Sequence, residues 1–367
     1  MKIVLAALAA TLLTSCSTGK KDKQKNYQEI AGRGPTNSRL QEIASFKGVQ
    51  VTGVTASEEG RLFASFPRWR EGVPFSVVEI FAGGVTKPYP NAEWNAWNGT
   101  PDPNKFTSVQ SVYAHKNHLY VLDPASPEMK GVIGNARLFR FDLSTNQLDR
   151  AWYFDQKIAP TNSYLNDVRI DEEEKKIFIT DSGIGGIVVI DENSGETRRL
   201  LDKHPSTKAE DVTLVVDQEK FDRRVHADGL AISPIDDMLY YQALTGRTLY
   251  RVPTDVLKTD IKHETQIVKN VENLGTTPAT DGMVFDNRGN LYMADLEKSS
   301  ITYRTPEGEI KTLVKDNRLE WPDTFTVDER MNELIFTDSH LQSAEVGKSV
   351  EDITFTIYRV SLPAKSL

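Results

Sequence analysis

The chain has 367 residues, a formal net charge of −8, 39% hydrophobic residues and a single cysteine. These values indicate a globular, mildly acidic protein that has no internal disulfide bond. No basic patch with interleaved aromatic residues appears, which argues against a nucleic-acid-binding protein.

The first 15 residues have the pattern of a bacterial secretory signal peptide. Lys2 is followed by an apolar run over residues 3–13, and small residues then precede Cys16. The run is too short to span a bilayer as a helix. Bacterial lipoprotein signals place a lipid-modified cysteine at this point, so we expect Cys16 to anchor the protein to a membrane; an ordinary signal peptide is the alternative. Ser17, in place of an Asp, favours the outer membrane or the cell surface, facing the periplasm or the exterior.

Residues 16–38 are predicted to be the lipidated cysteine and a flexible tether, because they are rich in Lys, Gly, Asn and Gln and poor in apolar residues. Residues 39–367 contain short runs of Val, Ile, Phe and Tyr separated by turn signals such as Asn193-Ser194-Gly195. This pattern predicts one all-β domain, and no long helical periodicity competes with it.

A repeat is visible in these strands. Each copy begins with a polar residue, continues into a short strand and turns into a second apolar strand. The six starting residues are Thr52, Gln110, Asn166, Asp228, Asp281 and Asp323, spaced roughly 40 to 60 residues apart. Repeated four-strand units of this size predict a six-bladed β-propeller rather than a sandwich or a β-helix. Residues 40–46 are expected to add the outermost strand of the last blade, beside residues 354–360.

The innermost strand of each propeller blade lines the central channel, so the six starting residues should form a ring around the axis. Three of them, Asp228, Asp281 and Asp323, are carboxylates. Like charges around one axis must be neutralised by protons, by hydrogen-bond donors or by a cation such as Ca²⁺ or an organic amine. The alternative is that these side chains only bind water or cap neighbouring strands.

Further residues are expected around this ring. Two positions before it, Tyr164, His226 and Trp321 would form an aromatic rim that suits a cationic or aromatic small molecule. His226 would act as a general base, or would only bond Asp228 and pack. Residues 88–106, with Trp94 and Trp97, would cover one channel mouth or pack on the outside. Acids that end the second strands are expected to make structural bonds between blades; they are Asp123, Asp181, Asp295 and Asp338.

The sequence resembles the major royal jelly protein/Yellow family. Phe66-Pro67-Arg68-Trp69 is similar to that family's first blade, and His226-Ala227-Asp228-Gly229-Leu230 to its fourth. The resemblance implies a six-bladed propeller with a small-molecule site at one channel mouth. It also implies binding of a biogenic amine or a dopachrome-type isomerisation. In such an isomerase His226 or Asp281 would be the base, with the ligand held by Tyr164, Asp228, Asp323 and Trp321.

A more distant resemblance is to gluconolactonases and luciferin-regenerating propellers. That group binds one divalent cation through a Glu in the first blade, Asn residues in the third and fourth, and an Asp in the fifth. Here Asn166 and Asp281 match, Asp228 is a conservative change, and Thr52 replaces the Glu. The resemblance implies a lactonase with Ca²⁺ or another divalent cation on Asn166, Asp228 and Asp281. A third hypothesis is a non-enzymatic surface protein that presents the propeller to a protein partner.

Overall fold

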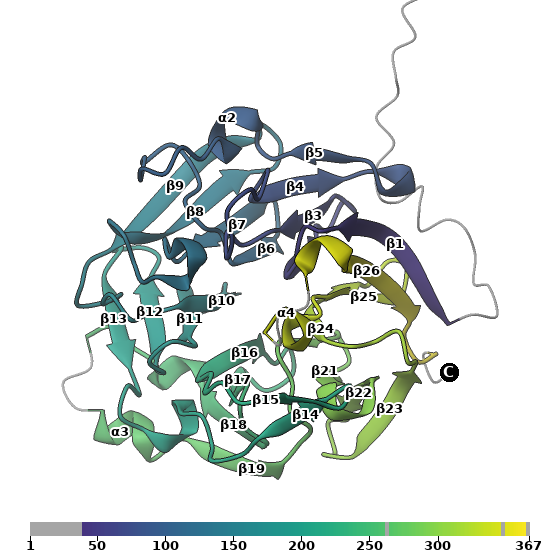
Figure 1. The fold of residues 1–367 in the computed structure, drawn as a ribbon. Helices are drawn as coiled ribbons and strands as arrows, with labels where there is room; N and C mark the ends of the chain where they lie inside the picture. The colour runs from purple at the N-terminus through teal and green to yellow at the C-terminus, as the bar shows by residue number, and fades with distance from the viewer. Residues whose placement is uncertain (1–38, 261–263, 346–348, 365–367) are drawn as a thin grey trace, which may run out of the picture.

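Each repeat forms one four-stranded antiparallel sheet, and the six sheets stand around a common axis, which confirms the six-bladed β-propeller (Figure 1). The structure, a computed structural model, describes residues 39–260, 264–345 and 349–364. The expected signal peptide, Cys16 and the tether lie outside these described residues.

The strands of each blade follow the chain from the axis outward in the first five blades. Blade one consists of β2 (Gly53–Ala56), β3 (Leu62–Ser65), β4 (Val77–Ile80) and β5 (Thr86–Pro88). Blade two consists of β6 (Ser111–His115), β7 (His118–Asp123), β8 (Ala136–Asp142) and β9 (Gln147–Phe154). Blade three consists of β10 (Leu165–Asp171), β11 (Lys176–Asp181), β12 (Ile187–Asp191) and β13 (Thr197–Leu200). Blade four consists of β16 (Ala227–Ile232), β17 (Met238–Ala243), β18 (Thr248–Pro253) and β19 (Glu272–Thr276). Blade five consists of β20 (Met283–Phe285), β21 (Leu291–Asp295), β22 (Ser300–Arg304) and β23 (Ile310–Lys315).

The sixth blade closes the ring with strands from both ends of the domain. It contains β24 (Pro322–Asp328), β25 (Glu333–Asp338), β26 (Thr354–Ser361) and, outermost, β1 (Leu40–Lys47). β1 pairs antiparallel with β26, with Leu40 opposite Val360 and Lys47 opposite Thr354. The predicted closing strand is therefore confirmed, and it covers an edge that would otherwise be open.

Apolar side chains fill the spaces between neighbouring blades, which explains why many strands are buried on both faces. All residues of β11 are buried, as are all but the last of β12. Phe178 of blade three packs with Leu230 and Tyr241 of blade four, and Ile335 of blade six packs with Val54 of blade one. Burial of these faces at about 25 cal/mol per Å² is the main stabilising contribution in a domain without disulfides.

The first strands approach one another closely around the axis. A Cβ added to Gly229 would lie 2.4 Å from the main-chain oxygen of Asp281, and one added to Gly282 would lie 2.6 Å from that of Asp323. Only glycine permits this approach. The Thr180 hydroxyl adds a bond from blade three to the main-chain oxygen of Asp228 at 2.7 Å.

Two insertions lie over one face of the propeller near its axis. They are the hairpin of β14 (Leu214–Val216) and β15 (Glu219–Phe221), and the short helix α4 (Leu341–Glu345), which contacts β15 (Figure 1). The helices α2 (Ala92–Asn95) and α3 (Thr265–Val268) lie at the periphery. Within the described ranges, no helix has the length and apolar character needed to cross a membrane.

Candidate functional site

The six residues that start the repeats meet at the axis and are all buried. Hydrogen bonds join the side chains of four neighbouring members, from Gln110 to Asp281. Gln110 Nε2 donates to Asn166 Oδ1 at 3.1 Å, and Asn166 Nδ2 donates to Asp228 Oδ2 at 2.6 Å. The Asp228 and Asp281 carboxyl groups are also hydrogen-bonded to each other. The residues expected to form the ring are therefore a buried polar cluster, in which Asp323 interacts with Asp281 through charge.

The hydrogen-bonded chain extends beyond the ring at both ends. Trp69 Nε1 donates to the Tyr164 hydroxyl at 2.6 Å, and that hydroxyl donates to Gln110 Oε1 at 2.8 Å. At the other end, Trp321 Nε1 donates to Asp281 Oδ2 at 2.7 Å. Since Trp69 follows the second strand of blade one and Trp321 precedes blade six, every blade contributes to one network. Such a network holds the ring rigidly only while each buried polar group keeps its hydrogen-bond partner.

The carboxyl groups of the ring retain protons that exposed carboxyl groups would lose. Burial, followed by the charge of Asp281, raises the pKa of both Asp228 and Asp323 well above the usual range. Burial also raises the pKa of Asp281, to about 6, although the bonds from Trp321 and Asp228 oppose this shift. When Asp281 is ionised, Asp228 therefore keeps its proton and donates a hydrogen bond to Asp281.

A fourth buried acid, Asp167, was not expected from the sequence. The register of β10 against β11 shifts between Leu165 and Val168, so Asn166 and Asp167 depart from strict alternation. Burial raises the pKa of Asp167, and its charge raises that of the three ring acids. Asp167 Oδ2 lies 3.5 Å from Arg169 Nη2 but makes no hydrogen bond. The only signal in the sequence was the second polar residue of the pair.

Arg169 closes the axis at the level below the ring. Its guanidinium group donates to the main-chain oxygen of Met283 at 2.9 Å and lies 4.9 Å from the centre of the Tyr113 ring. Because Met283 belongs to blade five, this side chain passes blade four and reaches across the axis. The carboxylate cluster is therefore bounded below by a cation–π pair.

Aromatic side chains cover the cluster on the opposite side. Trp321 is completely buried and packs on Phe221 of β15, with ring centres 4.9 Å apart. Trp69 is packed against the same apolar cluster. The expected aromatic rim is thus a closed layer, because Tyr164 and Trp321 are buried and already bonded. Trp321 is therefore covered by Phe221 of the β14–β15 hairpin.

His226 lies beside this layer and is partly exposed. Its Nδ1 accepts a hydrogen bond from the main-chain amide of Ala209 at 2.9 Å, and not from Asp228, whose bond was one of the two alternatives for this residue. Burial, assisted by the charge of Lys208, lowers the pKa of His226, so the ring favours its neutral form. A role as a base remains a prediction.

The acids that end the second strands make structural bonds, but all four of them bond within their own blade. Asp181 Oδ1 accepts from the main-chain amide of Tyr164 at 2.9 Å, and Asp338 Oδ1 from that of Trp321 at 2.5 Å. Asp123 holds the segment that enters blade two in the same way. The expected bond between blades is therefore wrong for all four acids. Asp295 pairs with Lys298 of its own blade at 2.8 Å. Asp123, Asp181 and Asp338 fasten the chain just before their own first strand. Two of them thereby position the residues of the aromatic layer.

The candidate metal ligands converge, but their atoms are engaged with one another. Asn166 turns its amide nitrogen toward Asp228, while its oxygen accepts from Gln110. The Trp321 indole occupies one oxygen of Asp281. Within residues 39–260, 264–345 and 349–364, no group of three or more His, Cys, Asp or Glu side chains is arranged to hold a metal ion. In this arrangement the three residues do not fit the oxygen cage that Ca²⁺ requires.

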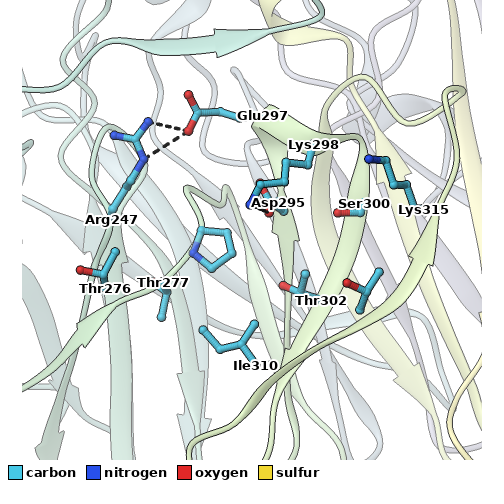
Figure 2. A pocket seen from close by; sticks show the side chains of 12 residues that line it. Arg247, Thr276, Thr277, Asp295, Glu297, Lys298, Ser300, Thr302, Ile310 and Lys315 are labelled. Carbon is cyan, nitrogen blue, oxygen red and sulfur yellow. Dashed lines mark hydrogen bonds and ion pairs between the residues drawn. The ribbon is translucent and has the colours of Figure 1, made fainter.

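A separate groove of about 510 Å³ lies between blades four and five (Figure 2). Thr276, Thr277 and Thr302 contribute hydroxyl groups to its wall. Arg247 Nη2 pairs with Glu297 Oε2 at 2.5 Å, and Lys298 pairs with Asp295 at 2.8 Å. These two ion pairs compensate four of the five charged side chains that line the groove, and Lys315 is the fifth.

Comparison with known proteins decides the family. The model of the family described as major royal jelly protein matches residues 107–365, from the entry to blade two through β26 of blade six. The chain belongs to the major royal jelly protein family. Major royal jelly protein 6 of Apis mellifera is 23% identical over 245 residues, which cover 63% of this chain and 55% of that protein. Major royal jelly protein 7 of the same organism is 26% identical over 204 residues, which cover 50% and 44%. This member of the family spans about half the length of the curated relatives it matches.

Solved structures share the fold of this major royal jelly family member. A gluconolactonase from Xanthomonas campestris has a TM-score of 0.55 at 12% identity, covering 88% of this chain and 89% of its own. A luciferin-regenerating enzyme has a TM-score of 0.55 at 13% identity, covering 89% and 95%. Regucalcin from Agrobacterium tumefaciens, a calcium-binding protein, has a TM-score of 0.51 at 13% identity, covering 86% and 91%. At these identities the likeness shows the fold alone.

Proposed function

We propose that this protein is an exported lipoprotein that binds a small molecule carrying a protonated amine beside a polar or aromatic group. The binding residues are Asp228, Asp281 and Asp323 at the propeller axis, with Tyr164 and Trp321 beside them. The observation that carries the proposal is the burial of these acids and Asp167 around one cation, Arg169.

Among the described residues, this cluster has more acids than the one guanidinium group paired with it, that of Arg169, can neutralise. The protein compensates by keeping protons on its carboxyl groups, which is why their pKa values are raised. An ammonium group placed among them would supply the missing charge and release protons. It would also lie next to the Trp321 and Tyr164 rings, whose faces attract cations.

Access to the cluster runs through the aromatic layer. Trp69 is only half-buried, and its indole nitrogen is bonded to one side chain, that of Tyr164. Displacement of the segment that carries Trp69 would expose Tyr164 and the acids below it. We infer that ligand binding includes this movement, as is common for segments that cover ligand sites.

An isomerase built on this site would use the same carboxyl groups. The proton shared by Asp228 and Asp281 can be given to one atom of a ligand while the ionised partner removes a proton from another. His226, next to the aromatic layer, would be the second base. This activity requires that substitution of Asp281 abolish turnover while the ligand still binds.

The location of the protein is part of the proposal. Lipid on Cys16 would hold the propeller at the outer membrane or the cell surface, with its ligand in the extracytoplasmic space. Incorporation of labelled fatty acid into the wild-type protein, lost in Cys16→Ala, tests this point. Incorporation that persists in Cys16→Ala, or no incorporation into the wild type, would contradict it.

The ligand proposal is tested by calorimetric titration with tyramine, using phenol and ethylamine as partial ligands. Binding of tyramine should release protons, so its apparent enthalpy should change between buffers of different ionisation enthalpy. Asp281→Asn should weaken binding by about tenfold or more, as loss of a charge-assisted bond does. Asp149→Asn, at an exposed position in blade two, is the matched control. Equal binding of tyramine by both variants would place the ligand elsewhere.

A divalent-metal-dependent lactonase is the second candidate, favoured by the convergence of Asn166, Asp228 and Asp281 on one point. The calcium-binding regucalcin that shares this fold is consistent with it. Binding would require loss of the Asp228 proton and rotation of Asn166. Thermal melts with Ca²⁺, Mg²⁺, Mn²⁺ and Zn²⁺ after chelation test the idea. A saturable rise in Tm that Asp281→Ala abolishes would support a cation on the axis, and no rise with any ion would exclude the lactonase.

A further inference from the structure

Arg68 is a buried cation whose charge is not paired. Its side chain is 3% exposed, and its guanidinium group donates to the Ser76 hydroxyl and, at 2.6 Å, to the main-chain oxygen of Asn95. Its Nε makes no hydrogen bond. No carboxylate among the described residues lies within ion-pair distance of it. Buried arginines are rarely left in this state, because an unpaired buried charge is costly.

The acids nearest to Arg68 are committed elsewhere or face water. Asp123 is held by Arg137 at 3.1 Å and by main-chain amides. Glu128 pairs with Lys130 at 2.8 Å, and Glu71 is exposed. Within the described part of the chain, the guanidinium group therefore has only neutral oxygen atoms as hydrogen-bond partners, and burial, opposed by the charge of Asp123, lowers the pKa of Arg68 to about 10.

Arg68 lines a cavity of about 290 Å³ on the face of the propeller that carries the aromatic layer. Trp97, Val73 and Ile133 give this cavity apolar walls, and Arg70 also lines it. The size is near the lower end of small-molecule sites, which combine apolar walls with few polar groups. Trp97 comes from the insertion at residues 88–106, which therefore contributes to this cavity, while Trp94 packs on Phe106.

The wall of the cavity is held in a strained conformation. Glu128 and Met129 have left-handed backbone angles, with φ of 53° and 55°. The main-chain amide of Glu128 donates to the oxygen of Arg68 at 2.6 Å, which joins the second blade's loop to the first blade's. Strain of this kind is costly in residues other than glycine and is concentrated at ligand sites.

We propose that this cavity binds a small organic anion, namely a carboxylate with a compact aromatic or apolar body. The carboxylate would neutralise Arg68, and its apolar body would lie against Trp97 and Ile133. This site is separate from the axial cluster, because Trp69 turns toward Tyr164 while its neighbours Arg68 and Arg70 line the cavity. The inference goes beyond the proposed axial function and does not depend on it.

The test is titration of the folded protein with benzoate and with its neutral counterpart benzamide, followed by tryptophan fluorescence and calorimetry. Benzoate should bind saturably. Benzamide should bind at least about tenfold more weakly than benzoate, because it lacks the charge. Trp97→Ala should weaken both ligands. Arg68→Lys should bind benzoate more weakly than the wild type, since a lysine lacks the planar fork. Arg330→Gln, on a distant turn of blade six, should leave binding unchanged.

Two further variants make the result decisive. Asp281→Asn should bind benzoate like the wild type, which separates this site from the axis even if the proposed amine ligand fails. Glu71→Gln should strengthen benzoate binding by removing a negative charge from the wall. Equal affinity for benzoate and benzamide, or no binding of benzoate, would overturn the proposal. A loss of stability in Glu71→Gln would also overturn it, since Glu71 would then be the counter-ion of Arg68. Fluorescence changes that persist in Trp97→Ala would place the ligand elsewhere.

Discussion

Arg169 of blade three donates a hydrogen bond to the main-chain oxygen of Met283 in blade five, at 2.9 Å, past the strand that separates them. The same guanidinium group lies 3.5 Å from Asp167 and over the Tyr113 ring. One side chain therefore closes the axis, braces two blades that are not neighbours and provides the cation closest to the buried acids.

Arg169→Met should destabilise the propeller by about 3 to 5 kcal/mol, because it leaves Asp167 as an uncompensated buried acid. Urea unfolding at neutral pH measures the change. Adding Asp167→Asn should restore much of the loss, since the variant then has no unpaired charge. If the double variant is no more stable than Arg169→Met, the guanidinium group acts by bracing the blades and not by charge.

The raised pKa of Asp281 predicts a pH-dependent stability. The folded state keeps a proton up to about pH 6, whereas the unfolded chain loses it near pH 4. The stability that this proton provides is present below the unfolded pKa and is lost as pH rises through the folded pKa. The side chain introduced by Asp281→Asn cannot ionise. The stability of this variant relative to the wild type should therefore rise by about 2 kcal/mol between pH 4 and pH 7. Denaturant melts of both proteins at several pH values measure this difference, and parallel curves would contradict it.

Asp228→Asn should be tolerated at neutral pH, because an amide copies the shape and the donor of a protonated carboxyl group. The amide can still accept a hydrogen bond from Asn166 and donate one to Asp281. Asp228→Leu introduces a side chain of similar size but should lower the stability of the fold by more than about 2 kcal/mol, because it leaves buried polar partners without a hydrogen bond. Thermal melts of the two variants give the comparison. Equal losses would show that volume, and not hydrogen bonding, matters at this position.

Gly229→Ala and Gly282→Ala should each destabilise the domain by about 1 to 3 kcal/mol, because the new methyl group would overlap the main chain of the next blade. Gly99→Ala is the control. Gly99 has a left-handed φ of 88° but open space around its Cβ, so only about 1 kcal/mol of backbone strain is expected. Chemical denaturation ranks the three variants. A smaller effect at Gly229 than at Gly99 would mean that the blades separate easily.

Tyr164→Phe should loosen the aromatic layer while leaving the fold intact. It removes the bonds to Trp69 and Gln110, at a cost of about 1 to 2 kcal/mol. Amide hydrogen exchange should rise in the segment around Trp69, and remain unchanged in β22 and β23 on the far side of the ring. Exchange that does not change near Trp69 would show that apolar packing alone holds the cover.

The sequence alone determined the architecture of this protein. Six copies of a polar residue followed by two strands predicted six blades, and the polar starts predicted the ring of Thr52, Gln110, Asn166, Asp228, Asp281 and Asp323. The closing strand was also foreseeable, at residues 40–46. These features are repeated locally, and the period of a strand and the place of a turn depend on residues that are close in the chain.

Only the tertiary structure decided the state of the ring. The register shift that brings Asp167 to the axis and the reach of Arg169 to Met283 depend on how blades far apart in sequence approach each other. The layer in which Trp321 packs on Phe221 and Trp69 bonds Tyr164 likewise joins distant segments. Burial, and with it the raised pKa of each acid and the unpaired charge of Arg68, is a property of this packing. A sequence pattern shows which groups can ionise, whereas the packed surroundings set whether the charge is stable.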